Sequence, residues 1–144
     1  MAKRIFRAVC LISLWVFAAS VVIIMWVLYD YYSETQRTQL KRQTNQVAEG
    51  VELCGMEYLM RLSAEDYRIT YIDGDGTVLY DNKSDAAKLE NHKDREEVAQ
   101  AIETGYGESA RFSEILTQRQ IYAAKRLPDG RVIRLSDTQY TVFT

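Results

Sequence analysis

Two arginines carry the side chains best suited to hold a ligand in this chain of 144 residues. Arg95 lies at the start of a predicted short helix, and Arg111 lies in a predicted strand. A guanidinium can hold a carboxylate or a phosphate through two parallel hydrogen bonds. Each arginine therefore either binds an anionic ligand or forms an internal ion pair, and the candidate partners for such a pair are Glu90, Asp94 and Glu97.

Aromatic side chains could complete a pocket around such a ligand, or they could belong to the core instead. Four tyrosines are candidates for one role or the other: Tyr71, Tyr80, Tyr106 and Tyr122. We take Tyr71 and Tyr122, together with Arg95 and Arg111, as the candidate ligand-binding residues.

Other patterns do not support catalysis or metal binding. His92 is the single histidine, and we expect it in a structural role beside a helix start, because a phosphoacceptor histidine needs a helical hairpin and a nucleotide-binding partner. The Asp-Gly-Asp-Gly run that begins at Asp73 lacks the closing glutamate of a calcium loop, since Ser84 occupies the twelfth position. No GxxxxGK[ST] phosphate loop is present. We therefore predict no catalytic residues, no metal and no cofactor in this chain.

A membrane helix is predicted near the N-terminus. Residues 8–29 contain no charged side chain. Such a helix is roughly 33 Å long, enough to cross a hydrocarbon core of about 30 Å. Lys3, Arg4 and Arg7 precede it, so the positive-inside rule keeps residues 1–7 in the cytoplasm and places residues 30–144 outside. A cleaved secretory signal is the alternative, but the apolar run continues through Trp26, beyond the usual length of a signal core.

The outer part of the chain is acidic. Residues 30–144 hold all 20 acidic residues and 15 of the 18 basic ones, which gives a net charge of −5. This charge argues against nucleic acid as a partner and against a polybasic lipid-binding surface. Cys54 is the one cysteine outside the predicted span. It could link two subunits, although we expect it to be a small buried residue.

The spacing of apolar residues predicts a long helix over residues 30–62. Leu40, Val47 and Cys54 recur every seven residues, and further apolar residues widen this stripe. The stripe predicts packing against the helix's own domain. Residues 32–46 could in addition form a parallel contact in a homodimer.

An α+β fold follows from the rest of the chain. Strands are predicted at 67–72 and 77–80, joined by the turn 73–76, and at 108–116, 120–126 and 132–136, with a turn at 127–130. A short helix is predicted at 95–104, with Asp94 as its cap and Gly105 and Gly107 at its end. Segregated helices and strands indicate a five-stranded, mainly antiparallel sheet. We expect one face of this sheet to cover the long helix, and the other face to form a pocket with residues 81–107.

This order of elements resembles the extracytoplasmic single-Cache (PAS-like) sensor domain of bacterial membrane histidine kinases of the phosphate-regulon type. The resemblance is carried by RITYIDGDGTVLYD (68–81), ENHKDREEV (90–98), GYGESARFS (105–113) and YAA (122–124), behind the predicted anchor. Glu96 departs from the pattern, which has a proline after the arginine.

The resemblance implies the sensory input portion of a two-component sensor kinase in a bacterial plasma membrane. Residues 63–137 would be the sensor domain, and 138–144 the approach to a second membrane helix. The expected partners are the lipid bilayer, a second copy of the chain and, through a kinase part, a response regulator. ATP is expected only for that kinase part. Alternative outputs are a chemoreceptor or a cyclic-dinucleotide enzyme, and a third possibility is a stand-alone single-pass adaptor.

Overall fold

The computed structural model describes residues 2–113 and 118–139, so the end of the strand predicted at 108–116 and most of the segment 138–144 lie outside the described residues. The chain divides into two compact units, residues 1–35 and residues 36–144. Helix α1 (Ala2–Cys54) contributes residues to both units.

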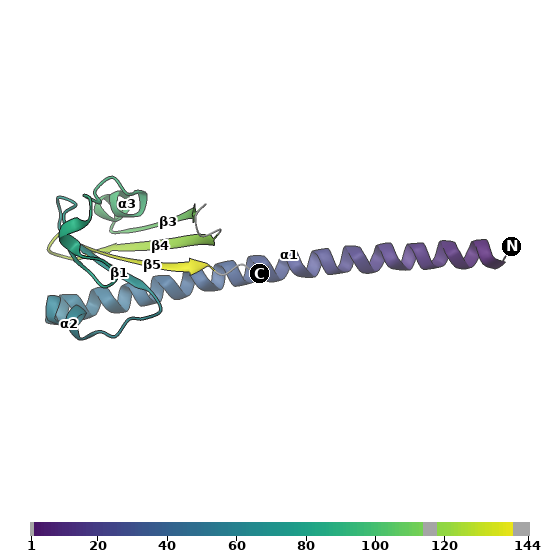
Figure 1. Ribbon diagram of the computed structural model, residues 1–144, viewed down its shortest axis with the longest axis horizontal. Helices are drawn as coiled ribbons and strands as arrows, with labels where there is room; N and C mark the ends of the chain where they lie inside the picture. The colour runs from purple at the N-terminus through teal and green to yellow at the C-terminus, as the bar shows by residue number, and fades with distance from the viewer. Residues whose placement is uncertain (1, 114–117, 140–144) are drawn as a thin grey trace. The chain divides into compact units, whose positions relative to one another are not determined.

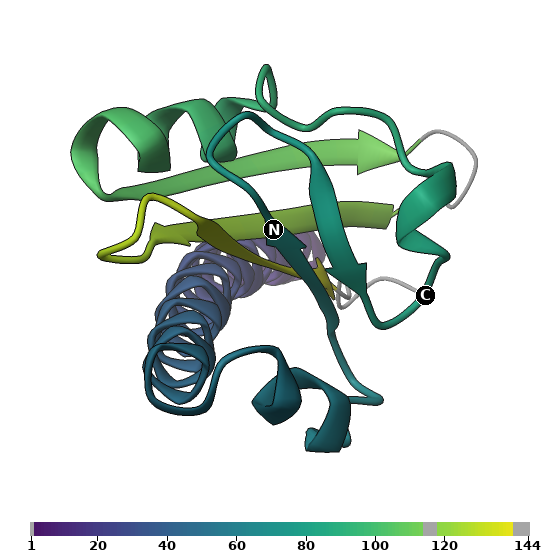
Figure 2. The ribbon, with the colours of Figure 1, turned by 90° about the vertical axis from the view of Figure 1, so that its left-hand side faces the viewer.

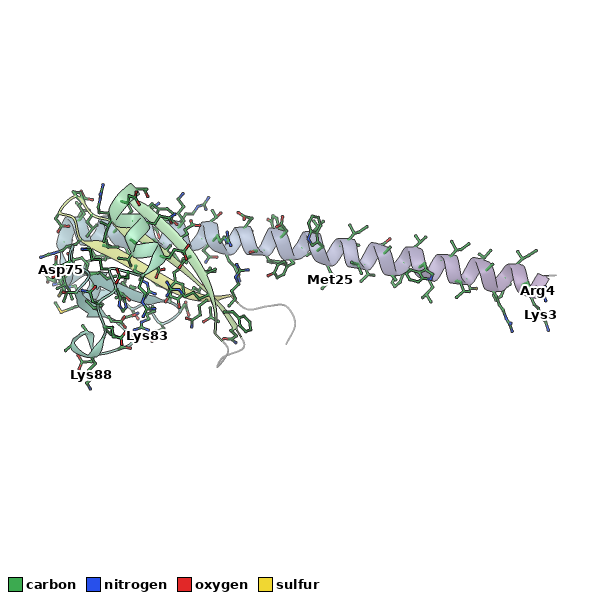
Figure 3. The ribbon with its side chains drawn as sticks, turned by 90° about the horizontal axis from the view of Figure 1, so that it is seen from above. Lys3, Arg4, Met25, Asp75, Lys83 and Lys88 are labelled. Carbon is green, nitrogen blue, oxygen red and sulfur yellow. The ribbon has the colours of Figure 1, made fainter. Side chains whose placement is uncertain are left out.

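The first unit is a single stretch of helix and a candidate membrane span. Its side chains project from the helix on all sides (Figure 3). The apolar ones are exposed, and Trp15 and Trp26 are 75% and 69% exposed. The hydroxyl of Ser20 donates a 2.8 Å hydrogen bond to the carbonyl of Val16 one turn earlier. This bond satisfies a polar group inside the apolar run, as a lipid environment requires.

The second unit begins with the remainder of α1, which ends earlier than predicted. Gly55 has φ 64°, a left-handed conformation that glycine adopts without a steric penalty, and helix α2 (Met56–Arg61) follows it. The predicted helix over 30–62 is therefore wrong in its last turns, because the chain breaks at Gly55. The expectation that Cys54 is buried is also wrong, since this last residue of α1 is exposed.

Five strands form one antiparallel sheet in the order β2-β1-β5-β4-β3. Figure 1 shows β3, β4 and β5 side by side. The predicted α+β class, the first hairpin and the final meander are confirmed, although β3 starts two residues earlier than expected. The strands are β1 (Arg68–Ile72), β2 (Val78–Asp81), β3 (Tyr106–Ser113), β4 (Gln118–Arg126) and β5 (Val132–Gln139).

Alternation along the strands divides the buried residues between the two faces of the sheet. Figure 2 shows α1 on one side of the sheet and α3 on the other. One face packs against α1 in a single apolar core, which includes Leu40, Val47, Val51, Ile69, Tyr71, Ile121, Ile133 and Leu135. The other face packs against helix α3 (Glu96–Thr104) in a smaller cluster of Ile72, Val98, Ala101, Ala124 and Val132. The predicted placement of the sheet between the long helix and the layer formed by residues 81–107 is confirmed.

The start of α3 differs from the predicted capping box. Arg95 is the N-cap instead of Asp94, and its side chain makes no capping hydrogen bond. Gly105 ends the helix with φ 94°, as predicted. Gly107 has a different role, because a Cβ at this position would collide with the carbonyl oxygen of Glu97. The glycine thus allows β3 to pass directly beneath the first turn of α3.

Candidate functional site

A buried carboxylate lies at the centre of the face that carries α3. The Glu97 side chain is 0% exposed and accepts three hydrogen bonds from two strands. Its Oε1 accepts from Arg134 Nε at 2.6 Å, and its Oε2 accepts from Arg111 Nη2 at 2.7 Å and from Ser109 Oγ at 2.5 Å. We call Glu97, Ser109, Arg111 and Arg134 the carboxylate clamp.

The sheet places the donors of the clamp on one face. Ser109 and Arg111 are two residues apart on β3, so both project to the same side, and Arg134 projects to that side from β5. Tyr122 on the intervening strand β4 pairs with Ser109 and lies under both guanidiniums. The Arg111 and Arg134 guanidiniums lie 4.9 Å and 4.4 Å from its ring centroid, within the range of cation–π attraction.

The charges of the clamp stabilise one another. Burial alone would raise the pKa of Glu97, but the hydrogen bond from Ser109 and the guanidinium of Arg134 outweigh it and hold this pKa below its usual value. Burial lowers the pKa of Arg134, while the Glu97 carboxylate opposes that effect. The clamp is therefore a buried ion pair with its hydrogen bonds satisfied, the arrangement in which removal of one partner is most costly.

Beside the clamp lies an open cavity of about 350 Å³. Its floor is the polar part of the sheet face, including Tyr122, and its wall is the loop before α3, including Leu89. Its lining is rich in basic side chains: Arg68, Lys83, His92, Arg95, Arg111 and Arg134.

These basic groups differ in how they are neutralised. Arg68 forms a 2.9 Å ion pair with the buried carboxylate of Asp81. Lys83 donates to the backbone carbonyl of Glu65 at 2.8 Å and makes no ion pair with a described residue. Arg95 likewise has no carboxylate partner within the described part of the chain. The wall of the cavity therefore carries two cations without a carboxylate partner.

His92 holds the loop in place through its backbone. Its N–H donates to the carbonyl of Gly76 at 2.8 Å, and its own carbonyl accepts from the N–H of Arg95 at 3.1 Å. These bonds agree with the predicted role beside the start of the helix. The side chain is only 6% exposed, and among the described residues its Nδ1 has no hydrogen-bond partner. Burial and the charges of Arg134 and Arg95 lower the pKa of His92.

Three of the four candidate ligand-binding residues share this cavity: Arg95, Arg111 and Tyr122. Arg111 forms an ion pair with Glu97, so the alternative of an internal ion pair holds for this arginine. Tyr71 lies on the opposite face, where it is 3% exposed in the core and its hydroxyl accepts from Arg131 at 3.3 Å. It does not join the others.

Sequence reasoning missed Arg68 and Arg134 as part of the site. Arg134 stands between the apolar residues Ile133 and Leu135. A single charge that alternates with apolar residues in a strand indicates a polar role on the opposite face, so this pattern was a usable signal. For Arg68 the signal was weaker, because the residue begins its strand.

A second cavity of about 400 Å³ lies near Arg37 of α1 and the strands β3 and β4. Arg37 and Glu108 are its two charged lining residues, so it has no excess of one sign. No group of three or more potential metal ligands occurs in residues 2–113 and 118–139. The basic cavity beside the clamp is therefore the strongest candidate site.

The chain was also compared with known proteins. No protein-family model matches it, and a search of curated proteins found no match.

Proposed function

We propose that this chain is the sensory input portion of a membrane-bound two-component sensor histidine kinase, with residues 30–144 outside the cytoplasm of a bacterium. The observation that carries the proposal concerns helix α1. The same helix supplies the candidate membrane span and, through Leu40, Val47 and Val51, part of the core beneath the sheet. An antiparallel sheet between this helix and a loop-and-helix layer is also the architecture that the sequence resemblance implies.

Strand β5 offers a physical route from the cavity to the helix. Arg134 faces the clamp and the cavity, while its neighbours Ile133 and Leu135 face α1 in the apolar core. A ligand that moves the guanidinium would therefore act on a strand whose other face packs against the helix. Two packing arrangements of that core, with different affinities for the ligand, are sufficient for a signal.

Phosphotransfer by the whole gene product tests the kinase assignment. Membranes that contain the complete product are incubated with γ-labelled ATP, in parallel with membranes that contain residues 1–144 alone. We expect acid-labile, base-stable label on histidine in the complete product and no label on residues 1–144. Absence of phosphohistidine from the complete product would contradict the kinase assignment. A methyl-accepting or cyclic-dinucleotide-forming activity in its place would favour one of the other outputs.

The two native cysteines test the orientation in the membrane. The variant Cys10→Ser leaves Cys54, which is exposed at the end of α1, as the only cysteine. A membrane-impermeant maleimide should label this variant in intact cells. The matched variant Cys54→Ser retains only Cys10, within the proposed span, and should stay unlabelled. Labelling of Cys54 only after the cells are opened would reverse the proposed orientation.

A further inference from the structure

We propose that the basic cavity beside the carboxylate clamp binds a small organic anion with at least two negative charges, and that this anion is the stimulus. The second half of this statement rests on the proposed function, whereas the first half does not. Four features of the described residues support it: an excess of positive charge, two unpaired cations, an unsatisfied buried nitrogen and the size of the cavity.

The charges around the cavity are not balanced. Five lining side chains are arginine or lysine, whereas two carboxylates among the described residues, Glu97 and Asp81, pair with them. This concentration of positive charge occurs in an outer region whose net charge is −5. A cleft lined by one sign of charge concentrates ligands of the opposite sign.

Two further carboxylates line the cavity and reduce the excess of positive charge without pairing with the described cations. Asp66 and Asp137 also line the cavity, but neither forms an ion pair with its cations. Asp137 follows Ile133 and Leu135 at every second position of β5, which turns its side chain toward the α1 face. Burial and the neighbouring Asp66 raise the pKa of Asp137, which agrees with a position away from the guanidiniums.

The cations divide into an occupied group and an available group. Arg111 and Arg134 are held by Glu97 and stack on Tyr122, so their positions are fixed. Arg95 and Lys83 lie on the loop side and pair with no carboxylate in the described part of the chain, although Lys83 donates to the backbone carbonyl of Glu65. An anion that contacts both groups would bridge the loop to the sheet. The two groups of cations lie on different elements, the loop and the sheet, so we assign a ligand with two or more anionic groups, one for each group of cations.

His92 supplies an independent indication of a missing partner. It lines the cavity, is more than nine-tenths buried, and its Nδ1 has no hydrogen-bond partner among residues 2–113 and 118–139. A buried polar atom without a partner costs about 1–3 kcal/mol, so such atoms are rare in native proteins. A ligand oxygen that accepts a hydrogen bond from Nδ1–H would remove this cost, and the nearby cations favour an acceptor of negative charge.

The dimensions indicate an organic ligand. A cavity of about 350 Å³ lies at the lower end of the range for small-molecule sites, roughly 300–1,000 Å³. Leu89 and the ring of Tyr122 offer apolar contacts for a short carbon skeleton. Carboxylate and phosphate groups both match the planar fork of arginine, so a dicarboxylate, a tricarboxylate and a phosphate monoester share the required chemistry.

Calorimetric titration of the full chain in nanodiscs of neutral phosphatidylcholine tests the proposal. The probes are succinate, citrate, glycerol 3-phosphate, inorganic phosphate and acetate. We expect at least one of the organic polyanions to bind with a Kd of about 1 mM or tighter, with acetate much weaker, and the preferred probe identifies carboxylate or phosphate as the source. Failure of every organic polyanion to bind below about 10 mM would overturn the proposal.

Two substitutions in the cavity and one outside it locate the binding. Arg95→Gln and Lys83→Gln each remove a cation that makes no ion pair with a described residue, so both variants should fold. Each should weaken binding about tenfold or more, the usual size of a charge-assisted hydrogen bond. Arg61→Gln removes the same charge on α2, where the side chain is exposed and paired with Glu57, and should leave binding unchanged.

The pattern of results separates the proposed anion site from the proposed kinase function. Equal weakening by Arg61→Gln, or no weakening by Arg95→Gln, would show attraction to net charge and would overturn the site. Specific binding by a gene product that never forms phosphohistidine would retain the site and contradict the kinase. Phosphotransfer that does not change when the bound anion is added would show that the anion is not the stimulus.

Discussion

The two faces of the sheet are built from the same five strands but bury different kinds of side chain. Toward α1, side chains such as Val47, Ile69 and Leu135 form a continuous apolar core. Toward α3, a small apolar cluster occupies one end, and beside it lie the carboxylate clamp and the basic cavity. Non-directional apolar packing tolerates small shifts, whereas a buried ion pair requires a defined geometry. Non-directional packing therefore holds the α1 face, whereas a buried ion pair of fixed geometry holds the α3 face beside the proposed binding cavity.

Removal of the Glu97 carboxylate should cause the largest loss in the free energy of unfolding. Glu97→Gln keeps the shape of the side chain but leaves the buried guanidinium of Arg134 without its charge partner. We expect a loss of about 3–5 kcal/mol in the free energy of unfolding. Urea unfolding followed by the near-ultraviolet circular dichroism of tyrosine measures it.

Glu103→Gln is the matched control for this variant, because Glu103 lies on the same helix and is exposed. Its effect should stay within about 0.5 kcal/mol. If the two variants lose the same free energy, the clamp does not hold α3 on the sheet and the contrast between the faces is wrong.

On the opposite face, Leu135→Ala should cost about 2–5 kcal/mol, because the leucine is fully buried in the α1 core and leaves a cavity. The variant should still bind the anion at denaturant concentrations where it remains folded, since every cavity residue is intact. Leu53→Ala is the matched control, because Leu53 is 85% exposed, and it should change stability by less than about 0.5 kcal/mol. Loss of anion binding in the folded Leu135→Ala variant would show that the α1 face contributes to binding as well as to stability.

The sequence alone predicts the helices and strands more completely than it predicts which side chains lie on each face of the sheet. Strand composition and turn residues located the hairpin and the meander, because these signals are local. Tyr71 and Tyr122 looked equivalent, yet they lie on opposite faces, since the face depends on strand register, which is not a local property. Glu97 was one of three possible ion-pair partners, and only the packing of α3 over Gly107 selects it. The break at Gly55 was missed because a single glycine is also tolerated inside a helix.

The pH dependence of stability should distinguish the faces through His92, the single histidine of the chain. Because its pKa is lowered in the folded state, the unfolded chain binds a proton more readily. Stability should therefore be highest above the unfolded pKa of about 6.5, and should fall as the pH drops through the folded pKa. Unfolding measured from pH about 7.5 to about 5 tests this expectation.

The variant His92→Gln should lose this decline near neutral pH, and the difference between the two curves removes contributions from carboxylates such as Asp137. The pH dependence of Leu135→Ala should match that of the wild type, because its face contains no histidine. A wild-type chain that becomes more stable from pH about 7 to about 5.5 would contradict the lowered pKa.

The smallest expected effects come from the two tyrosines. Tyr122→Phe removes a hydroxyl that donates to Gln120 at 2.6 Å, and Tyr71→Phe removes one that accepts from Arg131 at 3.3 Å. Each loss should cost about 0.5–1.5 kcal/mol.

Tyr122→Phe keeps the ring under both guanidiniums and should therefore preserve anion binding, whereas Tyr122→Leu removes the ring and should weaken it. Tyr71→Leu should leave binding unchanged, because Tyr71 contributes only to the α1 face. If Tyr122→Leu and Tyr71→Leu weaken binding equally, the aromatic ring acts through general stability and does not position Arg111 and Arg134.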